Sequence, residues 1–294
     1  MKETRKGIIL AGGTGSRLFP ITRAVSKQLL PIYDKPMIMY PLSILMLAGI
    51  KDILIITTER DRSNFRELLG NGNQFGISIK YCLQKKAIGL ADAFIIGEKF
   101  VDKDSVALIL GDNIFHGDEL ISKLRKFSSS KKGATIFAYP VSDPERYGVA
   151  ELSKEGKVIN IEEKPKSPKS NYAITGLYFY DNSVIKKAKS LNLSKRGELE
   201  ITDINNMYLN EGKLNAEIMG RGMAWFDTGT CDSLFEATSY IRTLERRQGL
   251  KVGCPEEIAW RSGWISTNNL RKLASDMMKS GYGSYLMKII EELI

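Results

Sequence analysis

Apolar and polar stretches alternate along the first 132 residues in a way that predicts strands separated by helices. Short apolar runs bounded by turn or polar residues are typical of buried parallel strands, and they occupy 7–11, 52–58, 77–83 and 105–110. Helical stretches are expected between them, at 37–49, 62–69 and 90–100. Strands that alternate with helices of this length indicate an α/β protein with a mainly parallel, Rossmann-like sheet wrapped by helices. In such sheets ligands bind beyond the carboxyl ends of the strands.

The pattern changes after residue 132. Residues 133–223 are dominated by extended segments with turn residues between them, at 134–139, 148–152, 158–161 and 172–180. We interpret them as a β-rich portion built onto the same sheet, without an independent domain. Residues 224–294 begin with a short apolar run at 224–226, which we also place in the sheet, and continue with helices expected at 234–250, 270–278 and 284–293. The chain of 294 residues is therefore expected to form a single domain with a core at 1–132.

The first strand leads directly into a glycine-rich loop, Gly12-Gly13-Thr14-Gly15-Ser16, which is followed by Arg17. Glycines allow positive φ and close approach of the main chain, so successive N–H groups can point into one concavity and hold an anion. Arg17 and Lys27 add a fork-shaped and a point-like cation to this loop, which suits a polyphosphate. The plainer alternative is a glycine-rich turn with two solvated cations.

Two common phosphate motifs do not match the loop. A dinucleotide fingerprint requires GxGxxG, but Leu18 stands three residues after Gly15, and prolines at 20, 31 and 36 leave no clean βαβ unit. A Walker loop requires GxxxxGK[ST], but Arg17 stands five residues after Gly12, where the second glycine would be, and no Lys-Ser or Lys-Thr directly follows it. A Rossmann cofactor and a P-loop are both disfavoured.

Two aspartates end short apolar runs that lie far apart in the sequence. Asp112 follows the strand at 105–110, and Asp227 follows the run at 224–226. Carboxylates at the carboxyl edge of a sheet can bind one Mg²⁺ whose shell is completed by substrate phosphates and water. For Asp112 alone, a simple cap of the following turn is the alternative.

Gln84 follows the third strand and Gly89 stands five residues later. An amide side chain can donate and accept at once, which suits the N3–H and carbonyl edge of thymine or uracil. Gln84 could instead only cap its loop.

The amino-acid sequence of these segments resembles that of the nucleotidyltransferases that make nucleoside-diphosphate sugars. Their signature is LAGG-x-G-[ST]-RL followed by K-x-LLP-x-x-x-KPM. Here it reads Leu10 to Leu18, then Lys27, Leu29-Leu30-Pro31 and Lys35-Pro36-Met37. The stretch SKQLLPIYDKPMI is most similar to the glucose-1-phosphate thymidylyltransferase group. The family's base-reading segment is usually Q-P-x-P-x-GLA-Q-AF. The chain departs from it at 85–88, where the proline-containing segment is replaced, and at Asp92, where glutamine is common.

The resemblance implies transfer of a thymidylyl group from dTTP to glucose 1-phosphate with Mg²⁺, giving dTDP-glucose and pyrophosphate by in-line attack on the α-phosphate. It also implies a role for each matching residue. Catalysis would fall to Arg17 and Lys27, and metal binding to Asp112 and Asp227. Nucleotide binding would use Leu10, Gly12, Gly13, Thr14, Gly15, Ser16, Gln28, Gln84 and Gly89. Sugar-phosphate binding would use Gly148, Glu163, Lys164, Ile174, Tyr178 and Arg196. For Glu162 and Lys164, a surface salt bridge of little energetic value is the alternative.

A homotetramer is the usual assembly of such enzymes, and the resemblance further implies feedback inhibition by dTDP-rhamnose at a second site between subunits. Residues 220–222 and 254–261 are candidates for that site. A UTP-dependent or other hexose-1-phosphate nucleotidyltransferase stays open as an alternative, as does a non-catalytic nucleotide-sugar sensor.

The composition of the chain limits the kinds of partner that it is expected to bind. A net charge of +9 would permit nucleic-acid binding, but the basic pairs are dispersed among acidic residues, so we expect no nucleic-acid partner. Without an apolar targeting segment or a run of about 18 apolar residues we expect no membrane partner and a cytoplasmic location. Cys82, Cys231 and Cys254 have no CxxC spacing and are expected to be buried fillers. The single histidine, His116, is interpreted as a loop residue near the sheet edge, which disfavours Ser-His-Asp and Cys-His chemistry.

Overall fold

The structure, a computed structural model, describes residues 5–292. Within these residues the strands are β1 (Arg5–Ala11), β2 (Pro31–Ile32), β3 (Lys35–Pro36), β4 (Asp52–Thr57), β5 (Ser78–Leu83), β6 (Ser105–Leu110), β7 (Ile114–Gly117), β8 (Ala134–Pro140), β9 (Gly148–Leu152), β10 (Val158–Glu163), β11 (Tyr172–Tyr180), β12 (Leu214–Ile218) and β13 (Met223–Phe226).

The α-helices of the same part are α1 (Met39–Leu47), α2 (Arg62–Leu69), α3 (Asp92–Ile96), α4 (Glu98–Val101), α5 (Leu120–Ser129), α6 (Val184–Lys189), α7 (Ile201–Asn210), α8 (Cys231–Gln248), α9 (Pro255–Arg261), α10 (Thr267–Asp276) and α11 (Gly281–Glu291). Short 3-10 turns are η1 (Ser16–Leu18), η2 (Ile21–Arg23), η3 (Lys27–Leu29), η4 (Asn73–Phe75) and η5 (Pro144–Arg146). None of the helices in residues 5–292 has both the length and the apolar composition needed to cross a bilayer.

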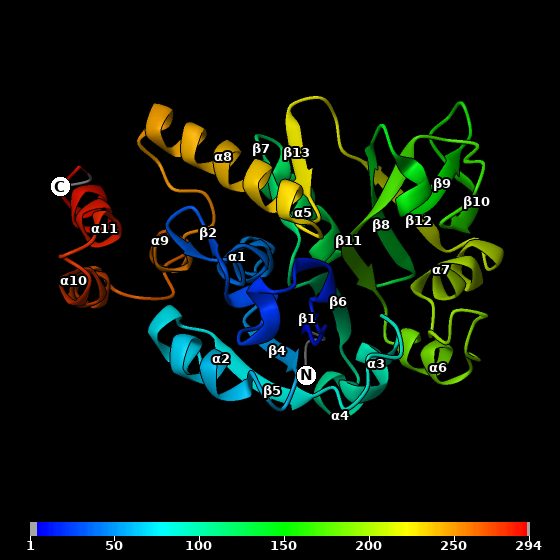
Figure 1. Cartoon of the computed structure of the whole chain (residues 1–294), viewed down its shortest axis with the longest axis horizontal. Coiled ribbons are helices and arrows are strands. Elements are labelled where there is room, and N and C mark those ends of the chain that lie inside the picture. Colours follow the sequence, from blue (N-terminus) through cyan, green and yellow to red (C-terminus); the bar gives the residue numbers. More distant parts are fainter. Residues whose placement is uncertain (1–4, 293–294) are drawn as a thin grey trace.

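Within the described residues, one nine-stranded sheet organises the molecule, with the order β10-β9-β11-β6-β1-β4-β5 and with β8 and β12 joined through β11 (Figure 1). Strands β6, β1, β4 and β5 are parallel neighbours, as the alternation of strands and helices predicts. β11 runs antiparallel to β6, so the strands of residues 133–223 extend this same sheet on one side. The expectation of an α/β fold with a mainly parallel centre is confirmed.

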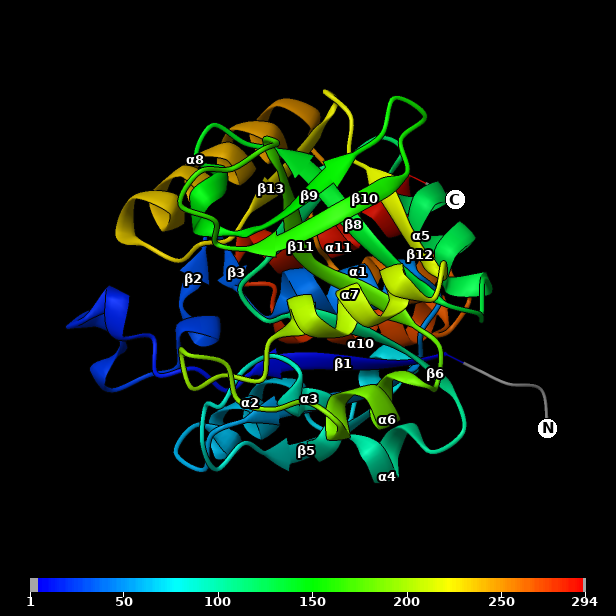
Figure 2. The same ribbon diagram turned by 90° about the vertical axis from the view of Figure 1, so that its right-hand side faces the viewer.

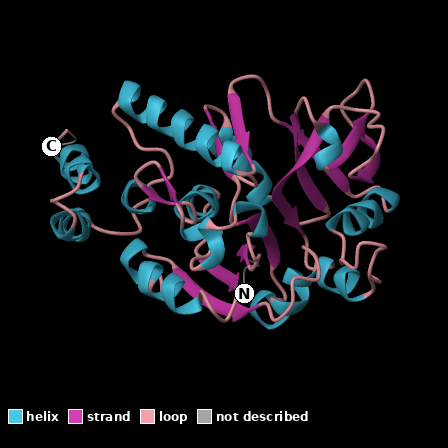
Figure 3. Ribbon diagram, in the orientation of Figure 1, coloured by secondary structure: helices cyan, strands magenta, loops and turns pink. Residues whose placement is uncertain are grey.

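Hydrophobic clusters cover both faces of the sheet, with helices arranged around the strands (Figure 3). Side chains alternate along β1, so Ile9 and Ala11 join the cluster with α1, α2, α5 and the C-terminal helices. Ile8 and Leu10 point to the other face, which α3, α4, α6 and α7 cover; α6 and α7 lie at the front of Figure 2. Because this core immobilises β1, the loop at its carboxyl end starts from a fixed position.

Several elements were predicted with correct bounds, and others were not. α2, β6, β9 and β11 begin and end at the predicted residues. The helix expected at 90–100 is divided at Gly97, where a Cβ would come within 2.8 Å of Ile8 Cδ1 and 2.9 Å of the Ala93 carbonyl oxygen. Residue 293, expected to end the last helix, lies outside the described residues. The sequence patterns did not predict α5, α6, α7, α9, β2, β3, β7 and β12.

Three placements were wrong. β13 does not join the main sheet; it pairs with β7 in a separate antiparallel ribbon, because a strand pattern specifies a strand and not its partner. His116 lies within β7 opposite Ala224, and therefore not in a loop. Of the cysteines, Cys254 is buried, whereas Cys82 is half-buried on the edge strand β5 and Cys231 is exposed as the first residue of α8.

Candidate active site

The glycine loop leaves β1 at Ala11 and reaches η1 through Gly15, whose φ of 63° lies in the left-handed region that favours glycine. The Gly15 carbonyl oxygen accepts hydrogen bonds from Leu18 N at 2.9 Å and from Thr22 Oγ1 at 2.7 Å. A Cβ at Gly12 would stand 2.3 Å from Gln84 Oε1, so a side chain there would displace the Gln84 amide. The loop is therefore held from both sides in a fixed conformation.

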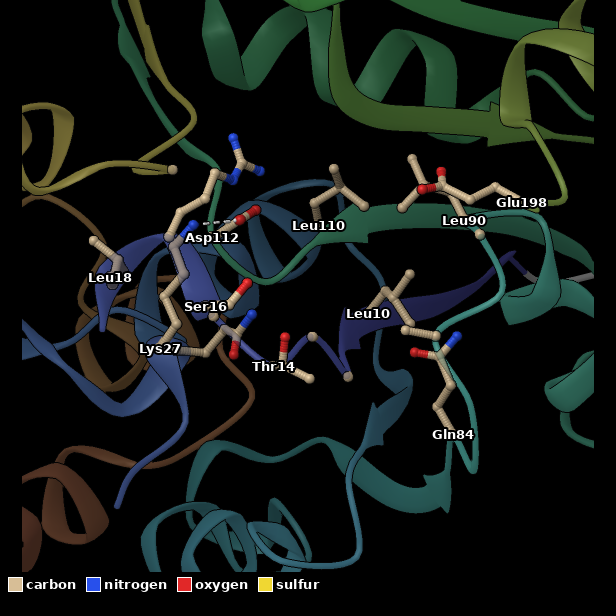
Figure 4. Close-up of a pocket in the computed structure, with 18 residues that line it drawn as sticks. Leu10, Thr14, Ser16, Leu18, Lys27, Gln84, Leu90, Leu110, Asp112 and Glu198 are labelled. Carbon is tan, nitrogen blue, oxygen red and sulfur yellow. Dashed lines mark hydrogen bonds and ion pairs between the residues drawn. The ribbon is translucent and has the colours of Figure 1, made fainter. Parts of the chain in front are cut away.

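A cleft of about 400 Å³ opens above this loop (Figure 4). Its walls come from the loop, from η3, from the segment that follows β5 and from the end of β6. It collects the predicted nucleotide-binding and catalytic residues Leu10, Gly12, Gly13, Thr14, Gly15, Ser16, Arg17, Lys27, Gln28, Gln84 and Gly89. The structure thus brings together residues that the sequence separates by nearly eighty positions.

A second cleft of about 580 Å³ lies beside the first. It collects the predicted sugar-phosphate residues Gly148, Glu163, Lys164, Ile174, Tyr178 and Arg196, and also Asp227. Arg17, Asp112 and Glu198 line both clefts, so the two are continuous at those side chains. The combined site has room for two ligands that meet at Arg17 and Asp112.

Glu163 is the polar centre of the second cleft. Its carboxylate accepts hydrogen bonds from Arg196 Nη1 at 3.0 Å and Thr202 Oγ1 at 2.6 Å. Burial, with the Glu163 carboxylate as a further cause, raises the pKa of Tyr178, so this phenol keeps its proton. Lys164 has a φ of 44°, in the left-handed region that a lysine rarely adopts, and its N–H donates to the Tyr147 carbonyl oxygen at 3.0 Å.

At the junction of the clefts, the ammonium of Lys27 connects the two predicted metal ligands. Lys27 Nζ lies 2.7 Å from Asp112 Oδ2 and 3.5 Å from the Asp227 carbonyl oxygen (Figure 4 shows the first contact). Thr228 Oγ1 donates to the Asp112 carbonyl oxygen at 2.7 Å, which places the chain around Asp227 against the end of β6. The two aspartates are neighbours even though β13 lies outside the main sheet.

The Asp227 carboxylate has polar partners from another segment. Tyr147 donates its hydroxyl hydrogen to Asp227 Oδ2 at 3.2 Å, and Arg146 Nη2 lies 3.4 Å from the same oxygen. Burial, and then the Asp227 charge, raises the pKa of the Tyr147 phenol, which therefore stays a hydrogen-bond donor.

The donor set at this corner fits a hard divalent cation. Carboxylate oxygens are ligands that Mg²⁺ accepts, and it usually takes one or two of them together with substrate phosphates and water. In residues 5–292 no group of three or more His, Cys, Asp and Glu side chains has a metal-binding arrangement. A cation held by Asp112 and Asp227 would therefore depend on ligand oxygens to complete its shell.

Sequence reasoning missed several groups that build the site. Asn113 Oδ1 accepts from Trp225 Nε1 at 2.7 Å and from Gly176 N at 3.0 Å, so it fastens β13 and β11 to the end of β6. Arg146 and Tyr147 hold Asp227. Tyr147 directly precedes Gly148, a predicted sugar-cleft residue, and that adjacency is a signal that could have identified it.

Two phosphorylated ligands can meet at Arg17 and Asp112, and this arrangement suits a protein that transfers a nucleotidyl group. The nucleotidyl transferase family model matches residues 6–243, most of the chain. The chain belongs to this family of enzymes, and membership implies a divalent metal ion.

Curated relatives match over nearly the full length. The glucose-1-phosphate thymidylyltransferase of Neisseria meningitidis is 56% identical, with 98% of this chain and 100% of the relative covered. The glucose-1-phosphate thymidylyltransferase of Mycobacterium tuberculosis H37Rv is 57% identical, with 97% of this chain and 99% of the relative covered. Among solved structures, a candidate glucose-1-phosphate thymidylyltransferase from Bacillus anthracis, in complex with sucrose, has a TM-score of 0.76, 47% identity and coverage of 81% of this chain and 96% of that one. A UDP-glucose pyrophosphorylase with bound UDP-glucose has a TM-score of 0.71 and 26% identity, and the match covers 82% of this chain and 99% of that one.

Proposed function

We propose that this enzyme transfers a thymidylyl group from dTTP to glucose 1-phosphate, giving dTDP-glucose and pyrophosphate. The observation that carries the proposal is the pair of continuous clefts, one on the glycine loop and one around Glu163, which meet at Arg17 and Asp112. Two anionic substrates can lie end to end in such a site. The sugar-phosphate oxygen then attacks the α-phosphate in line, and pyrophosphate leaves toward the glycine loop.

Each proposed role follows from position and charge. The N–H groups of the glycine loop hold the phosphates, while Arg17 and Lys27 neutralise charge that develops at the α-phosphate. Glu163 accepts hydrogen bonds from sugar hydroxyls, and Lys164 and Arg196 counter the attached phosphate. Burial lowers the pKa of the Arg196 guanidinium, but the neighbouring carboxylates, Glu198 first, together raise it more, so its positive charge persists.

Magnesium would be held by Asp112 and Asp227. When bound, it neutralises phosphate charge and polarises the reacting phosphoryl oxygens. Lys27 meanwhile keeps the Asp112 carboxylate directed toward the junction. We propose no covalent enzyme intermediate. His116 lines neither cleft; its Nδ1 is engaged with the Tyr240 hydroxyl at 3.0 Å.

The first test is pyrophosphate release over a panel of nucleoside triphosphates with glucose 1-phosphate and galactose 1-phosphate. We expect dTTP with glucose 1-phosphate to give the highest kcat/KM, and Asp112→Asn to lower kcat by roughly a hundredfold or more because phosphate charge is less compensated. An unmodified enzyme that binds dTDP-glucose tightly but releases no pyrophosphate from any pair would be a sensor and would contradict the proposal.

A uridylyl transferase is the second candidate. The amide of Gln84 matches the pairing edge of uracil as well as that of thymine, and one structural relative is a UDP-glucose pyrophosphorylase. A higher kcat/KM for UTP than for dTTP in the same panel would favour it. The homotetramer, the cytoplasmic location and the regulatory second site stay predictions.

A further inference from the structure

The amide of Gln84 is held in one orientation by a buried carboxylate. Gln84 follows β5 and Asp92 is the first residue of α3; each residue is only 8% exposed. Gln84 Nε2 donates to Asp92 Oδ2 at 3.2 Å. Gln84 Oε1 is directed into the nucleotide cleft (Figure 4). It lies next to Gly12, where a Cβ would stand 2.3 Å from it. In the part of the chain that the structure describes, no group donates a hydrogen bond to this oxygen.

A carboxylate determines which end of the amide it faces. A side-chain amide has nearly the same shape in its two orientations, so packing alone does not distinguish oxygen from nitrogen. An ionised carboxylate only accepts hydrogen bonds, and it can be satisfied only by the NH₂ end. The reversed amide would set two acceptor oxygens against each other in a buried position, which is costly because neither would have a donor. The acceptor end therefore remains in the cleft.

We propose that Asp92 is a positioning residue that fixes the polarity of the Gln84 amide and thereby makes the cleft select bases with an N–H at the pairing edge. Thymine and uracil present N3–H to an acceptor, whereas cytosine presents an acceptor nitrogen at the same place. Gln84 would contact the base, and Asp92 would act only through Gln84. The inference rests on the proposed function.

Replacement of Asp92 by asparagine separates this role from simple packing. The asparagine side chain has nearly the same shape as aspartate but can offer either an acceptor or a donor to Gln84. The amide of Gln84 can then turn to suit the incoming base. A cytosine nucleotide should gain most, because its mismatch disappears, while a uracil nucleotide still finds the original orientation.

The test compares dUTP with dCTP, whose bases differ only at the pairing edge. In Asp92→Asn the ratio of kcat/KM for dUTP to that for dCTP should fall by roughly ten- to a hundredfold. The KM for glucose 1-phosphate should not change. Loss of a negative charge near a triphosphate acts equally on both nucleotides and cancels in the ratio. Glu98→Gln, which removes a carboxylate from the surface of the neighbouring α4, is the matched control and should leave the ratio unchanged.

Two further variants distinguish positioning from structure. In a Gln84→Ala background, Asp92→Asn should leave the ratio unchanged, since no amide remains to be oriented; an equal fall in both backgrounds would overturn the inference. The charge-conserving pair Gln84→Glu with Asp92→Asn should prefer dUTP again, because the introduced glutamate can only accept. If Asp92→Asn alone does not fold, the ratio of kcat/KM for dUTP to that for dCTP is measured on this double variant instead. A preference of the double variant for dCTP would contradict the inference.

The inference and the proposed function fail differently. An unmodified enzyme that does not turn over dTTP or dUTP with glucose 1-phosphate would contradict the proposed function and remove the basis of the inference. An unmodified enzyme that favours dUTP over dCTP, together with a folded Asp92→Asn variant of unchanged ratio, would contradict the role of Asp92 alone.

Discussion

Neighbouring glycines of the loop have different structural reasons to be glycine. Gly12 lies beneath the Gln84 side chain, so a Cβ there would collide with protein. Gly13 is exposed, has no φ in the left-handed region, and would place a Cβ with no protein atom within 4 Å. The protein itself therefore does not require glycine at position 13. Only a ligand lying on the loop would.

Gly13→Ala should consequently affect binding and leave the fold intact. A methyl group that projects into the phosphate position is expected to raise the KM for dTTP by roughly tenfold to a hundredfold, in line with the effect of a single misfitting group in a binding site. The melting temperature and the KM for glucose 1-phosphate should not change. Gly281→Ala, at another exposed glycine whose Cβ would meet no atom within 4 Å, is the control. A wild-type KM for dTTP in Gly13→Ala would show that the triphosphate lies elsewhere.

The same contrast indicates which residues sequence reasoning can find. The glycine loop, Lys27 and Asp112 belong to short motifs whose chemistry is explicit, and the structure brings them into one cleft. Arg146 contacts Asp227 from 81 positions away, and its pKa is raised by the hydrogen bond to Asp143 and further by Asp227. Nothing local to Arg146 indicates that partner, because the contact exists only after the sheet has formed.

At the scale of elements, two lysines and two carboxylates join the β2–β3 turn to α8. Lys35 Nζ lies 2.6 Å from Asp34 Oδ1 and 3.1 Å from Glu245 Oε1, and the Lys35 side chain is only 3% exposed. Lys251 bonds to the same two carboxylates from beyond α8. Since each charge has an opposite partner, the network tolerates burial as a whole but not the loss of one member.

Lys35→Met should destabilise the protein strongly, because among residues 5–292 Asp34 and Glu245 would keep only Lys251 as a cationic partner. Breaking a buried pair in this way typically costs about 3–5 kcal/mol, measured as the free energy of unfolding in urea. Glu245→Gln in the Lys35→Met background should recover part of the loss. Lys288→Met, at an exposed pair with Glu292, is the control and should cost about 0–1 kcal/mol. A loss below about 1 kcal/mol in Lys35→Met would contradict the network's role.

Element boundaries were predictable where local signals were strong and partners were regular. β6, β9 and β11 are apolar and bounded by turns, and their bounds were correct. α9 was missed although Pro255 at its start and Glu256 and Glu257 in its first turn are ordinary helix-start signals. α9 has only seven residues, which is too short for hydrophobic periodicity to predict a helix. Its burial against α1 depends on the tertiary fold.

On the scale of the whole molecule, the order of the strands determines where the two clefts lie, and this order could not be predicted from the sequence. β11 bonds to β6 through residues 177–180 and to β9 at Ala173, with β8 along its other edge. This arrangement places the Glu163 cleft next to the glycine loop. Strand patterns predict that these segments extend the sheet, but their register depends on pairings between distant residues, such as Leu177 with Ile109 and Ala173 with Val149.

The C-terminal helices give the whole molecule a buried carboxyl group that should make its stability depend on pH. Glu256 in α9 is 5% exposed, and its Oε2 accepts from the Tyr282 hydroxyl of α11 at 2.6 Å. Burial raises the pKa of Glu256 in the folded protein, opposed by the hydrogen bond from Tyr282 and, more weakly, by Lys35. The folded state therefore binds this proton more tightly than the unfolded state does. As pH rises from the unfolded pKa through the folded one, this group progressively destabilises the fold.

Glu256→Gln should remove that destabilisation, because a glutamine carbonyl can still accept from Tyr282 but carries no charge at any pH. The difference in melting temperature, variant minus wild type, should become more positive as pH rises from about 4, near the unfolded value, toward neutrality. Glu292→Gln removes a carboxylate that is 58% exposed and separates the loss of charge from the loss of a buried carboxyl. Thermal unfolding of the three proteins over the same pH series measures the effect. A difference that is constant with pH would mean that folding leaves the pKa of Glu256 unchanged, and one that becomes more negative would mean that the hydrogen bonds to Glu256 outweigh its burial; either result would contradict the prediction.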